Sequence, residues 1–505
     1  MYGIWRAYRI NDVTDPGKSL VTLGGRGGGC SPSSKGQGRP RWVFHTDAPR
    51  GRLDGLMGIS GRAPDFPRPI LWAVVLVAAL VVGLALGLAV SGGSDSEATQ
   101  PSPGFVADVE CDLPPGQPFV GGPSVELVDL GEVDGVRVEG AAYPRPDYRG
   151  DPWSQWGQGL VLPDGRVLSA IGDQLGRDGN SYFYEYDPNT GVLAMLGDVL
   201  SYVEHEPGSW GYGKVHGRIV AGPCGEVYAS TYWGRSRDLE FSGSYRGDVL
   251  IRLDPYARTI SVVDVLVEEH GVPSLSGDPS RGLLYGEAID PLLKQQDIDQ
   301  GPFFVYDVVR GEKIFESPPT PHVGFRNILI DAQGRAYYSI GGGELAVYDP
   351  QTNQVQTHPY RMPGDWLRAS TTPTPDGRVI GVTRDPDTFF VLTPSGKIEP
   401  LGAPPYYTSV VVLAPGGESF YYIPDAHGSN RTEVSLTRVD TTTGEQTVVV
   451  DLAPLVEAGL GLRPGGTFNL SVSPEGDRLY VGLNSGALDA EDPFGEVVFL
   501  VVYLP

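Results

Sequence analysis

The sequence predicts an all-β fold, a seven-bladed β-propeller, from three observations. First, a turn with a central glycine occurs seven times from about residue 163 onward, and an apolar or aromatic strand follows each copy. Second, another turn, which most often contains Asp, occurs six times between copies of the first. Third, the chain contains 70 Gly and 45 Pro residues, a composition that favours many short strands over long helices.

The two turns divide each repeat into four expected strands. The first turn is clearest in Pro163-Asp164-Gly165-Arg166, and the second in Tyr186-Asp187-Pro188-Asn189-Thr190-Gly191. In the second repeat, the strands are expected at 217–220, 226–232, 248–253 and 259–266. Four antiparallel strands per repeat, arranged around an axis, are the pattern of a propeller.

The two ends of the repeat region predict how the ring closes. The last repeat ends at the apolar segment 497–503, so its fourth strand is missing. The segment 125–133 closely parallels 192–199, the fourth strand of the first repeat. We therefore expect 125–133 to complete the seventh blade and remove an open sheet edge. The propeller domain is expected to span residues 118–505.

The N-terminal region has a different composition. Residues 1–68 are rich in Gly, Arg and Ser and carry 11 Lys and Arg residues against 5 Asp, so we expect a mostly disordered basic tail. Residues 69–90 are apolar, uncharged and long enough for a transmembrane helix, a signal anchor. Residues 91–117 are expected to be a flexible linker. Arginines precede the apolar segment, which predicts a cytoplasmic N-terminus and an extracytoplasmic propeller.

A cleaved signal peptide is the alternative for this region. Translation would start at Met57, and Ala89-Val90-Ser91 resembles a cleavage site, so the propeller would be secreted. Both interpretations export the propeller. The net charge of −24 argues against a nucleic acid as partner.

The three cysteines divide between the two sides of the expected membrane. Cys30 lies in the cytoplasmic tail, whereas Cys111 and Cys224 lie in the exported part. In an oxidising compartment the last two either form a disulfide bond or remain two free thiols. The sequence leaves both alternatives open.

The repeated turns carry a resemblance to known families. The Pro-Asp-Gly-Arg and Tyr-Asp-Pro-x-Thr-Gly copies across most of residues 120–505 resemble the turns of YVTN/quinoprotein-like and SMP-30/virginiamycin B lyase-like propellers. The resemblance implies the fold. It transfers no catalytic residue, because these turns are structural in all of those families.

Propeller geometry predicts where a site would lie. The two turns of each blade share one face, called the bottom face here, and the long loops and the beginnings of the inner strands share the opposite, top face. Binding residues tend to lie on such loops. Counting about nine residues back from the bottom-turn glycines selects Trp156, His216, Pro273, Phe325, Arg368, Tyr407 and Thr467, and the adjacent positions add Lys214, Ser274, Arg326 and Asn469.

These positions suggest a cationic mouth with two catalytic candidates. His216 is the candidate general base, and Tyr407 is the second candidate catalytic residue. Trp156, Lys214, Arg326, Arg368 and Asn469 are expected to bind a ligand, since arginines bind carboxylates and phosphates. The structural alternatives are a hydrogen-bonded histidine, arginines paired with acidic residues, and a tyrosine that only packs.

No metal and no cofactor are assigned. His205, Glu206, His216, His322 and His427 are the residues that such a site would use, but they show no tight ligand spacing. Oligogalacturonate-lyase propellers use a histidine-rich metal site, and SMP-30-like lactonases use acidic and amide ligands in the channel. The inferred ring lacks acidic residues, which argues against the second activity.

Two classes of function follow. In the first, a membrane-anchored propeller binds an anionic small molecule, a carbohydrate or a protein at the top-face mouth. In the second, the same mouth belongs to a lyase or hydrolase that acts on an anionic carbohydrate or a cyclic ester. The fold does not decide between them.

Overall fold

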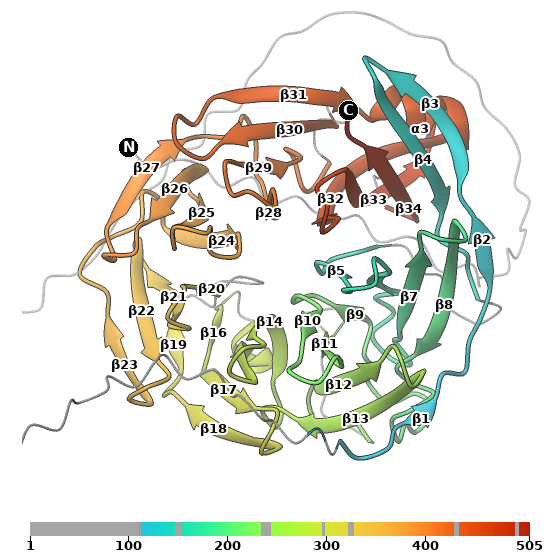
Figure 1. Cartoon of the computed structure of the whole chain (residues 1–505). Helices are drawn as coiled ribbons and strands as arrows, with labels where there is room; N and C mark the ends of the chain where they lie inside the picture. The colour runs from blue at the N-terminus through green and yellow to red at the C-terminus, as the bar shows by residue number, and fades with distance from the viewer. Residues whose placement is uncertain are drawn as a thin grey trace, which may run out of the picture. The chain divides into compact units, whose positions relative to one another are not determined.

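Strands dominate the computed structural model, and Figure 1 shows their sheets arranged around a central axis. The structure describes residues 111, 113–146, 154–233, 244–294, 298–321, 328–428, 434–489 and 494–505. All of them belong to one compact unit, residues 98–505. The expected basic tail, the expected transmembrane helix at 69–90 and most of the linker lie outside the described residues.

Blades one and two each gain an extra strand from the N-terminal segment. Blade one has the order β2-β8-β7-β6-β5. Its strands are β2 (Ser124–Glu126), β5 (Leu160–Val161), β6 (Val167–Gly172), β7 (Ser181–Asp187) and β8 (Val192–Asp198). Blade two has the order β1-β13-β12-β11-β10, with β9 also paired to β11. Its strands are β1 (Gln117–Pro118), β9 (Lys214–Val215), β10 (Val220–Ala221), β11 (Val227–Tyr232), β12 (Val249–Asp254) and β13 (Thr259–Val265).

Blades three and four are four-stranded antiparallel sheets. Blade three comprises β14 (Gly271–Asp278), β15 (Leu283–Ile289), β17 (Phe303–Asp307) and β18 (Glu312–Glu316). Blade four comprises β20 (Leu329–Ile330), β21 (Ala336–Gly341), β22 (Glu344–Asp349) and β23 (Gln354–Thr357). The connections around blade three hold the short helix α2 (Pro291–Lys294) and a two-stranded sheet of β16 (Gln300–Gly301) and β19 (Thr320–Pro321).

Blades five and six repeat the same order from the axis outward. Blade five comprises β24 (Trp366–Ser370), β25 (Val379–Arg384), β26 (Thr388–Leu392) and β27 (Ile398–Gly402). Blade six comprises β28 (Val411–Leu413), β29 (Ser419–Tyr422), β30 (Ser435–Asp440) and β31 (Gln446–Asp451). Together with the seventh sheet, these sheets give the seven blades that the repeat predicted.

Blade seven joins the two ends of the chain, but with a different strand from the expected one. Its order is β3-β4-β34-β33-β32, from β3 (Val128–Val133), β4 (Val136–Ala142), β32 (Leu462–Val472), β33 (Arg478–Ala487) and β34 (Glu496–Tyr503). The strand beside β34 is β4, with pairs from Val498–Ala142 to Tyr503–Arg137. The prediction that 125–133 lies beside 497–503 is therefore wrong. That segment divides between β2, on the edge of blade one, and β3, outside β4.

Hydrophobic packing connects each blade to its two neighbours. Seven clusters of buried apolar residues form among the described residues, and each contains residues of two adjacent blades. One of them joins blade seven to blade one, for example through Phe499 and Tyr186, whose ring centroids are 5.1 Å apart. Because a twisted sheet cannot bury both faces alone, this mutual covering supplies the core.

The bottom-face turns require glycine. The central glycines of the seven copies of the first turn have φ between 65° and 88°, in the left-handed region that other residues rarely adopt. Cys224 lies in one of these turns and forms a disulfide bond with Cys111, with an S–S distance of 2.06 Å. The bond and the pairing of β1 with β13 both attach the N-terminal segment to blade two.

Helices contribute little to the described part of the chain. Helix α3 (Ala453–Leu460) packs its buried Val456 against blade seven and ends at Gly461, which has φ of 68°. Among the described ranges, no helix has the length and apolar character needed to span a bilayer.

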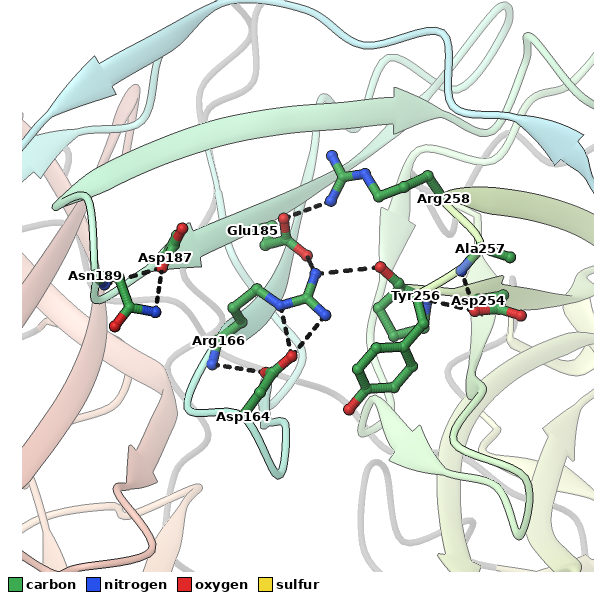
Figure 2. Close-up of polar contacts among 10 residues, drawn as sticks. Asp164, Arg166, Glu185, Asp187, Asn189, Asp254, Tyr256, Ala257 and Arg258 are labelled. Atoms are coloured by element: carbon green, nitrogen blue, oxygen red, sulfur yellow. Dashed lines mark hydrogen bonds and ion pairs between the residues drawn. The ribbon is translucent and has the colours of Figure 1, made fainter.

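A charged contact joins the bottom turns of blades one and two (Figure 2). Arg166 donates from Nη1 to Glu185 Oε2 at 2.7 Å and to the carbonyl oxygen of Pro255 at 3.1 Å, and Asp164 accepts from its Nε at 2.9 Å. Arg258 donates to the other oxygen of Glu185 at 2.6 Å. Arg378, in the second Pro-Asp-Gly-Arg copy, likewise donates to the carbonyl oxygen of Thr441 in blade six at 3.0 Å. The arginine of this motif therefore links a blade to the next one.

The substitution Arg166→Met should lower the free energy of unfolding by about 1–3 kcal/mol, because it leaves a mostly buried carboxylate with one partner fewer. Arg258→Met is the matched control, since Arg258 contacts the same carboxylate but is 51% exposed in its side chain, against 16% for Arg166. Urea unfolding followed by tryptophan fluorescence measures both. Equal losses for the two variants would show that burial of the contact is unimportant.

Candidate functional site

A group of aromatic and cationic side chains from five blades gathers where the inner strands begin, opposite the bottom turns. We call it the mouth cluster. Its members are Trp156, Lys214, His216, Tyr232, Arg368, Arg384, Tyr407, His427, Phe468 and Phe494. Five of them, namely Trp156, Lys214, His216, Arg368 and Tyr407, were selected from the sequence.

Trp156 is the centre of the cluster. Its ring lies nearly parallel to those of Phe468 and Phe494, with centroids 4.8 and 5.6 Å away. Its Nε1 donates to Ser154 Oγ at 2.6 Å, which fixes the orientation of the indole. The side chain is half-buried, so part of it faces solvent. An aromatic surface held in one orientation loses little conformational entropy when a ligand packs against it.

Blade two places a lysine and a histidine beside this indole. Lys214 Nζ lies 4.5 Å from the Trp156 ring centroid and 5.0 Å from that of Tyr232. The His216 ring stacks 6.2 Å from Trp156, and its Nδ1 lies 2.8 Å from the carbonyl oxygen of Pro273. Because a carbonyl only accepts hydrogen bonds, Nδ1 carries the proton in the neutral ring and the lone pair lies on Nε2. His216 is therefore hydrogen-bonded, as the structural alternative expected. The same hydrogen bond also leaves Nε2 unprotonated, as a general base requires.

Blades five and six supply the other cationic end. Arg368 is buried and donates to Tyr407 Oη from Nε, at 3.1 Å, and also from Nη2. The guanidinium of Arg384 lies 4.9 Å from the same ring. His427 connects this end to the centre, since its ring lies 4.9 Å from Tyr407 and 6.3 Å from Trp156. The contacts therefore run without a break from His216 to Arg368.

An acidic residue lies beside the two arginines, which corrects the expectation of a mouth without acidic groups. Burial raises the pKa of Asp387, while the charges of Arg384 and Arg368 act in the opposite direction. Its Oδ1 has no hydrogen-bond partner among the described residues. Asp387 and Arg384 belong to the β25–β26 connection and the end of β25, so a count along inner strands could not find them.

In blade seven the strand phase differs from the prediction. The register of β32 on β33 shifts between Thr467 and Asn469, and Phe468 is the residue that contacts Trp156. Asn469 instead accepts a hydrogen bond from the backbone nitrogen of Gly159, at 2.8 Å, in the contact between blades seven and one. Asn469 therefore takes part in the contact between two blades and not in the mouth cluster.

Several predicted positions lie elsewhere or outside the described residues. Arg326, Phe325 and His322 fall in 322–327, which the structure does not describe. His205 pairs with Asp178 at 2.9 Å. Ser274, at the start of blade three, donates to the buried carboxylate of Glu287 at 2.9 Å. Within the described ranges, no group of three or more His, Cys, Asp or Glu residues is arranged to hold a metal ion.

Two buried aspartates accept hydrogen bonds from the top-face connections of blades one and two. Asp173 accepts from the backbone nitrogens of Asn180 and Leu175, at 2.9 and 3.1 Å. Asp248 accepts from Thr231 Oγ1 at 2.9 Å and from the backbone nitrogen of Val272 at 3.2 Å. Burial raises the pKa of each carboxyl to about 7.

These pKa values predict a pH dependence. A carboxyl with a raised pKa in the folded state binds a proton more tightly there than in the unfolded chain, so it stabilises the fold at low pH, and that stability is lost as the pH rises from about 4 to about 7. In the wild-type protein the free energy of unfolding should therefore decrease by a few kcal/mol over this pH range, and Asp248→Asn should remove that decrease. Asp264→Asn, at an exposed position of β13, is the control. Urea unfolding at pH 4.5, 6 and 7.5 measures the slopes; an unchanged slope for Asp248→Asn would contradict the assignment.

Comparison with known proteins gives likeness at the level of the fold. No family model matches the chain, and neither does any curated protein. A structure of oligogalacturonate lyase in complex with manganese has a TM-score of 0.48 and 12% identity, covering 76% of this chain and 98% of that one. The U3-55K structure has a TM-score of 0.47 and 12% identity, covering 73% of this chain and 98% of that one. A structure of virginiamycin B lyase from Staphylococcus aureus has a TM-score of 0.44 and 10% identity, covering 72% of this chain and 99% of that one. The fold assignment itself comes from the strand pairing above.

Proposed function

We propose that the mouth cluster binds an anionic ligand, and that the ligand is an acidic carbohydrate. The observation that supports this most strongly is the continuous contact from Lys214 and His216, through the aromatic surface of Trp156, to Tyr407 and Arg368. The apolar C–H face of a pyranose ring packs on an aromatic plane, and a carboxylate accepts hydrogen bonds from lysine or arginine.

Solvent exposure in the cluster is consistent with this proposal. His427 is exposed, and Trp156, Tyr407, Arg384 and Phe494 are half-buried, so the aromatic surface is accessible. Lys214 and Arg368 are 8% and 7% exposed. Charged groups in such surroundings interact more strongly with an anion than fully solvated ones do, because less water screens the interaction.

Isothermal titration with two matched trisaccharides tests the proposal. A trisaccharide of galacturonic acid should bind at least about 10-fold more tightly than the neutral trisaccharide of galactose, and its affinity should fall as sodium chloride is raised. Equal affinities, or no binding of either sugar, would reject the carbohydrate proposal. Binding of an acidic peptide in place of the sugar would keep the anionic ligand and replace the carbohydrate with a protein.

A lyase activity at the same mouth is the second candidate, favoured by the tautomer of His216. Its Nδ1 contact with Pro273 leaves the lone pair on Nε2, and the cluster also holds arginines, which stabilise the enolate charge that develops when a proton is removed beside a carboxylate. If the acidic trisaccharide is a substrate, its cleavage should produce an unsaturated sugar that absorbs ultraviolet light. His216→Ala should abolish that signal with little change in melting temperature. A simultaneous loss of stability would instead indicate a structural role.

We also propose that residues 69–90 anchor the chain in a membrane with the propeller outside the cytoplasm. The uncharged apolar segment and the preceding arginines support this orientation. Protease added to intact cells should remove the propeller and spare residues 1–68. Full protection of the propeller would contradict the orientation, and a mature N-terminus near Gly92 would favour the cleaved signal peptide and a secreted protein.

A further inference from the structure

A half-buried arginine reaches across the central axis below the mouth cluster. Arg218 lies between β9 and β10 in blade two, and its Nη2 donates to the carbonyl oxygen and, at 3.3 Å, to Oγ of Ser370, the last residue of β24 in blade five. These two blades are not neighbours in the ring (Figure 1). Arg218 and Ser370 each follow a mouth-cluster residue, His216 and Arg368, by two positions. The contact therefore lies further along the inner strands, toward the bottom face, than the mouth cluster does.

The guanidinium of Arg218 has no carboxylate partner among the described residues. Its described hydrogen bonds are the two to Ser370, which come from one of its three nitrogens. The inner strands β5, β9, β10, β14, β20, β24, β28 and β32 together contain one acidic residue, Asp278, at the bottom end of β14. Asp278 is already paired with Arg281 at 2.6 Å. A guanidinium is always charged in proteins, and the described inner strands provide no carboxylate beside this one.

Solvent reaches Arg218, and a hydroxyl without a described partner belongs to the neighbouring strand β14. Solvent reaches part of the Arg218 side chain. Nevertheless, the protein surrounds it closely enough for burial to lower its pKa to about 10. The side chain is therefore largely surrounded by protein and still partly in contact with solvent. The backbone nitrogen of Arg218 donates to the carbonyl oxygen of Leu275, at 3.1 Å, and the next residue, Ser276, has a buried hydroxyl without a hydrogen-bond partner in the described structure.

We propose that Arg218 binds a small monoanion at the centre of the ring, either a halide ion or a carboxylate group, with the Ser276 hydroxyl as a second donor. The remaining guanidinium N–H groups supply the charge-assisted hydrogen bonds. The ligand supplies the negative charge that the described residues do not place beside this guanidinium. The site does not depend on the carbohydrate proposal, since it uses none of the mouth-cluster side chains.

Bromide soaked into crystals of the propeller tests the site by anomalous scattering. A peak within about 3.5 Å of the Arg218 guanidinium is expected in the wild-type protein. The peak should disappear in Arg218→Gln and persist in Arg384→Gln. By contrast, Arg384→Gln should weaken the binding of the acidic trisaccharide. The two proposals can therefore fail separately. A bromide map without a peak at Arg218, or a peak that persists in Arg218→Gln, overturns the site.

Thermal unfolding keeps the test independent of crystals. In sodium bromide, the melting temperature of the wild-type protein should rise by roughly 2 °C relative to the sodium salt of a bulky sulfonate at equal ionic strength. Arg218→Gln should lose this difference and Arg218→Lys should retain part of it. The same difference in wild type and Arg218→Gln would contradict a site at this residue. Acetate distinguishes the two ligands: displacement of the bromide peak identifies a carboxylate site, and its persistence limits the site to halides.

Discussion

Arg368→Met is expected to lower the affinity for the acidic trisaccharide by about 100-fold, with a much smaller loss for the neutral one. Arg368 is 7% exposed and its guanidinium is held against Tyr407 Oη. A carboxylate that reaches this position binds in surroundings where removal of one partner of a hydrogen-bonded charge pair costs about 2–5 kcal/mol. Methionine keeps much of the apolar volume and removes the charge, so the loss of affinity should be largest for acidic ligands. Isothermal titration of both sugars measures it.

Arg478→Met provides the matched control for this experiment. Arg478 is also a strand arginine near an acidic residue, with Asp477 3.2 Å away, but it lies at the bottom face at the start of β33. Its removal should leave both affinities unchanged. A similar loss of affinity in the two variants would mean that the general charge of the propeller, rather than the mouth cluster, attracts the ligand. The melting temperature of each variant shows whether the fold is intact.

Val138→Asp is expected to prevent recovery of soluble, folded protein. Val138 is fully buried in β4, pairs with Val502 of β34 and belongs to the apolar cluster between blades six and seven. An unpaired carboxylate there loses its hydration and also removes an apolar contact, which together exceed about 4 kcal/mol. Circular dichroism and size-exclusion chromatography of the soluble fraction measure the outcome.

Val128→Asp tests whether the position of β4, rather than any charge in this segment, produces that loss. Val128 lies on β3, the outermost strand of the same sheet, and is 49% exposed. The variant should fold with a change within about 0.5 kcal/mol. If both variants fold equally well, β4 is not an interior strand of blade seven.

The turns predicted the blades because their chemistry is local. A glycine with positive φ after Pro-Asp, and an Asp that binds the next backbone nitrogens, identify a bottom turn without knowledge of distant contacts. In the second repeat, the expected strands at 226–232 and 259–266 agree with β11 and β13 to within one residue. The arginine that links neighbouring blades was not predicted, since its partner Pro255 lies in the next repeat.

The closing strand was predicted wrongly because three apolar segments near the N-terminus are similar in composition. The signal for the correct choice was present in Asp134-Gly135, which have φ of 53° and 84° and form a tight two-residue hairpin between β3 and β4. Ending the expected closing strand at residue 133 missed this hairpin. Composition alone could not show that β4, rather than β3, pairs with β34.

About half of the mouth cluster could be predicted, and the limit is physical. A count along inner strands finds Trp156, His216 and Arg368, because those positions repeat in every blade. It cannot find Phe468, since a bulge shifts the phase of β32 by one residue. Phe494 and Arg384 come from a loop and a second strand, whose direction depends on tertiary packing. His427 was named from the sequence only as a possible metal ligand. Arg218 was missed because its role depends on a contact across the axis.

The most direct test of the central claim is a crystal structure of the propeller with the trisaccharide of galacturonic acid. A sugar ring packed on Trp156 and a carboxylate within hydrogen-bond distance of Lys214 or Arg368 are expected. Density for the sugar on the bottom face or between outer strands, with the mouth cluster unchanged, would contradict it.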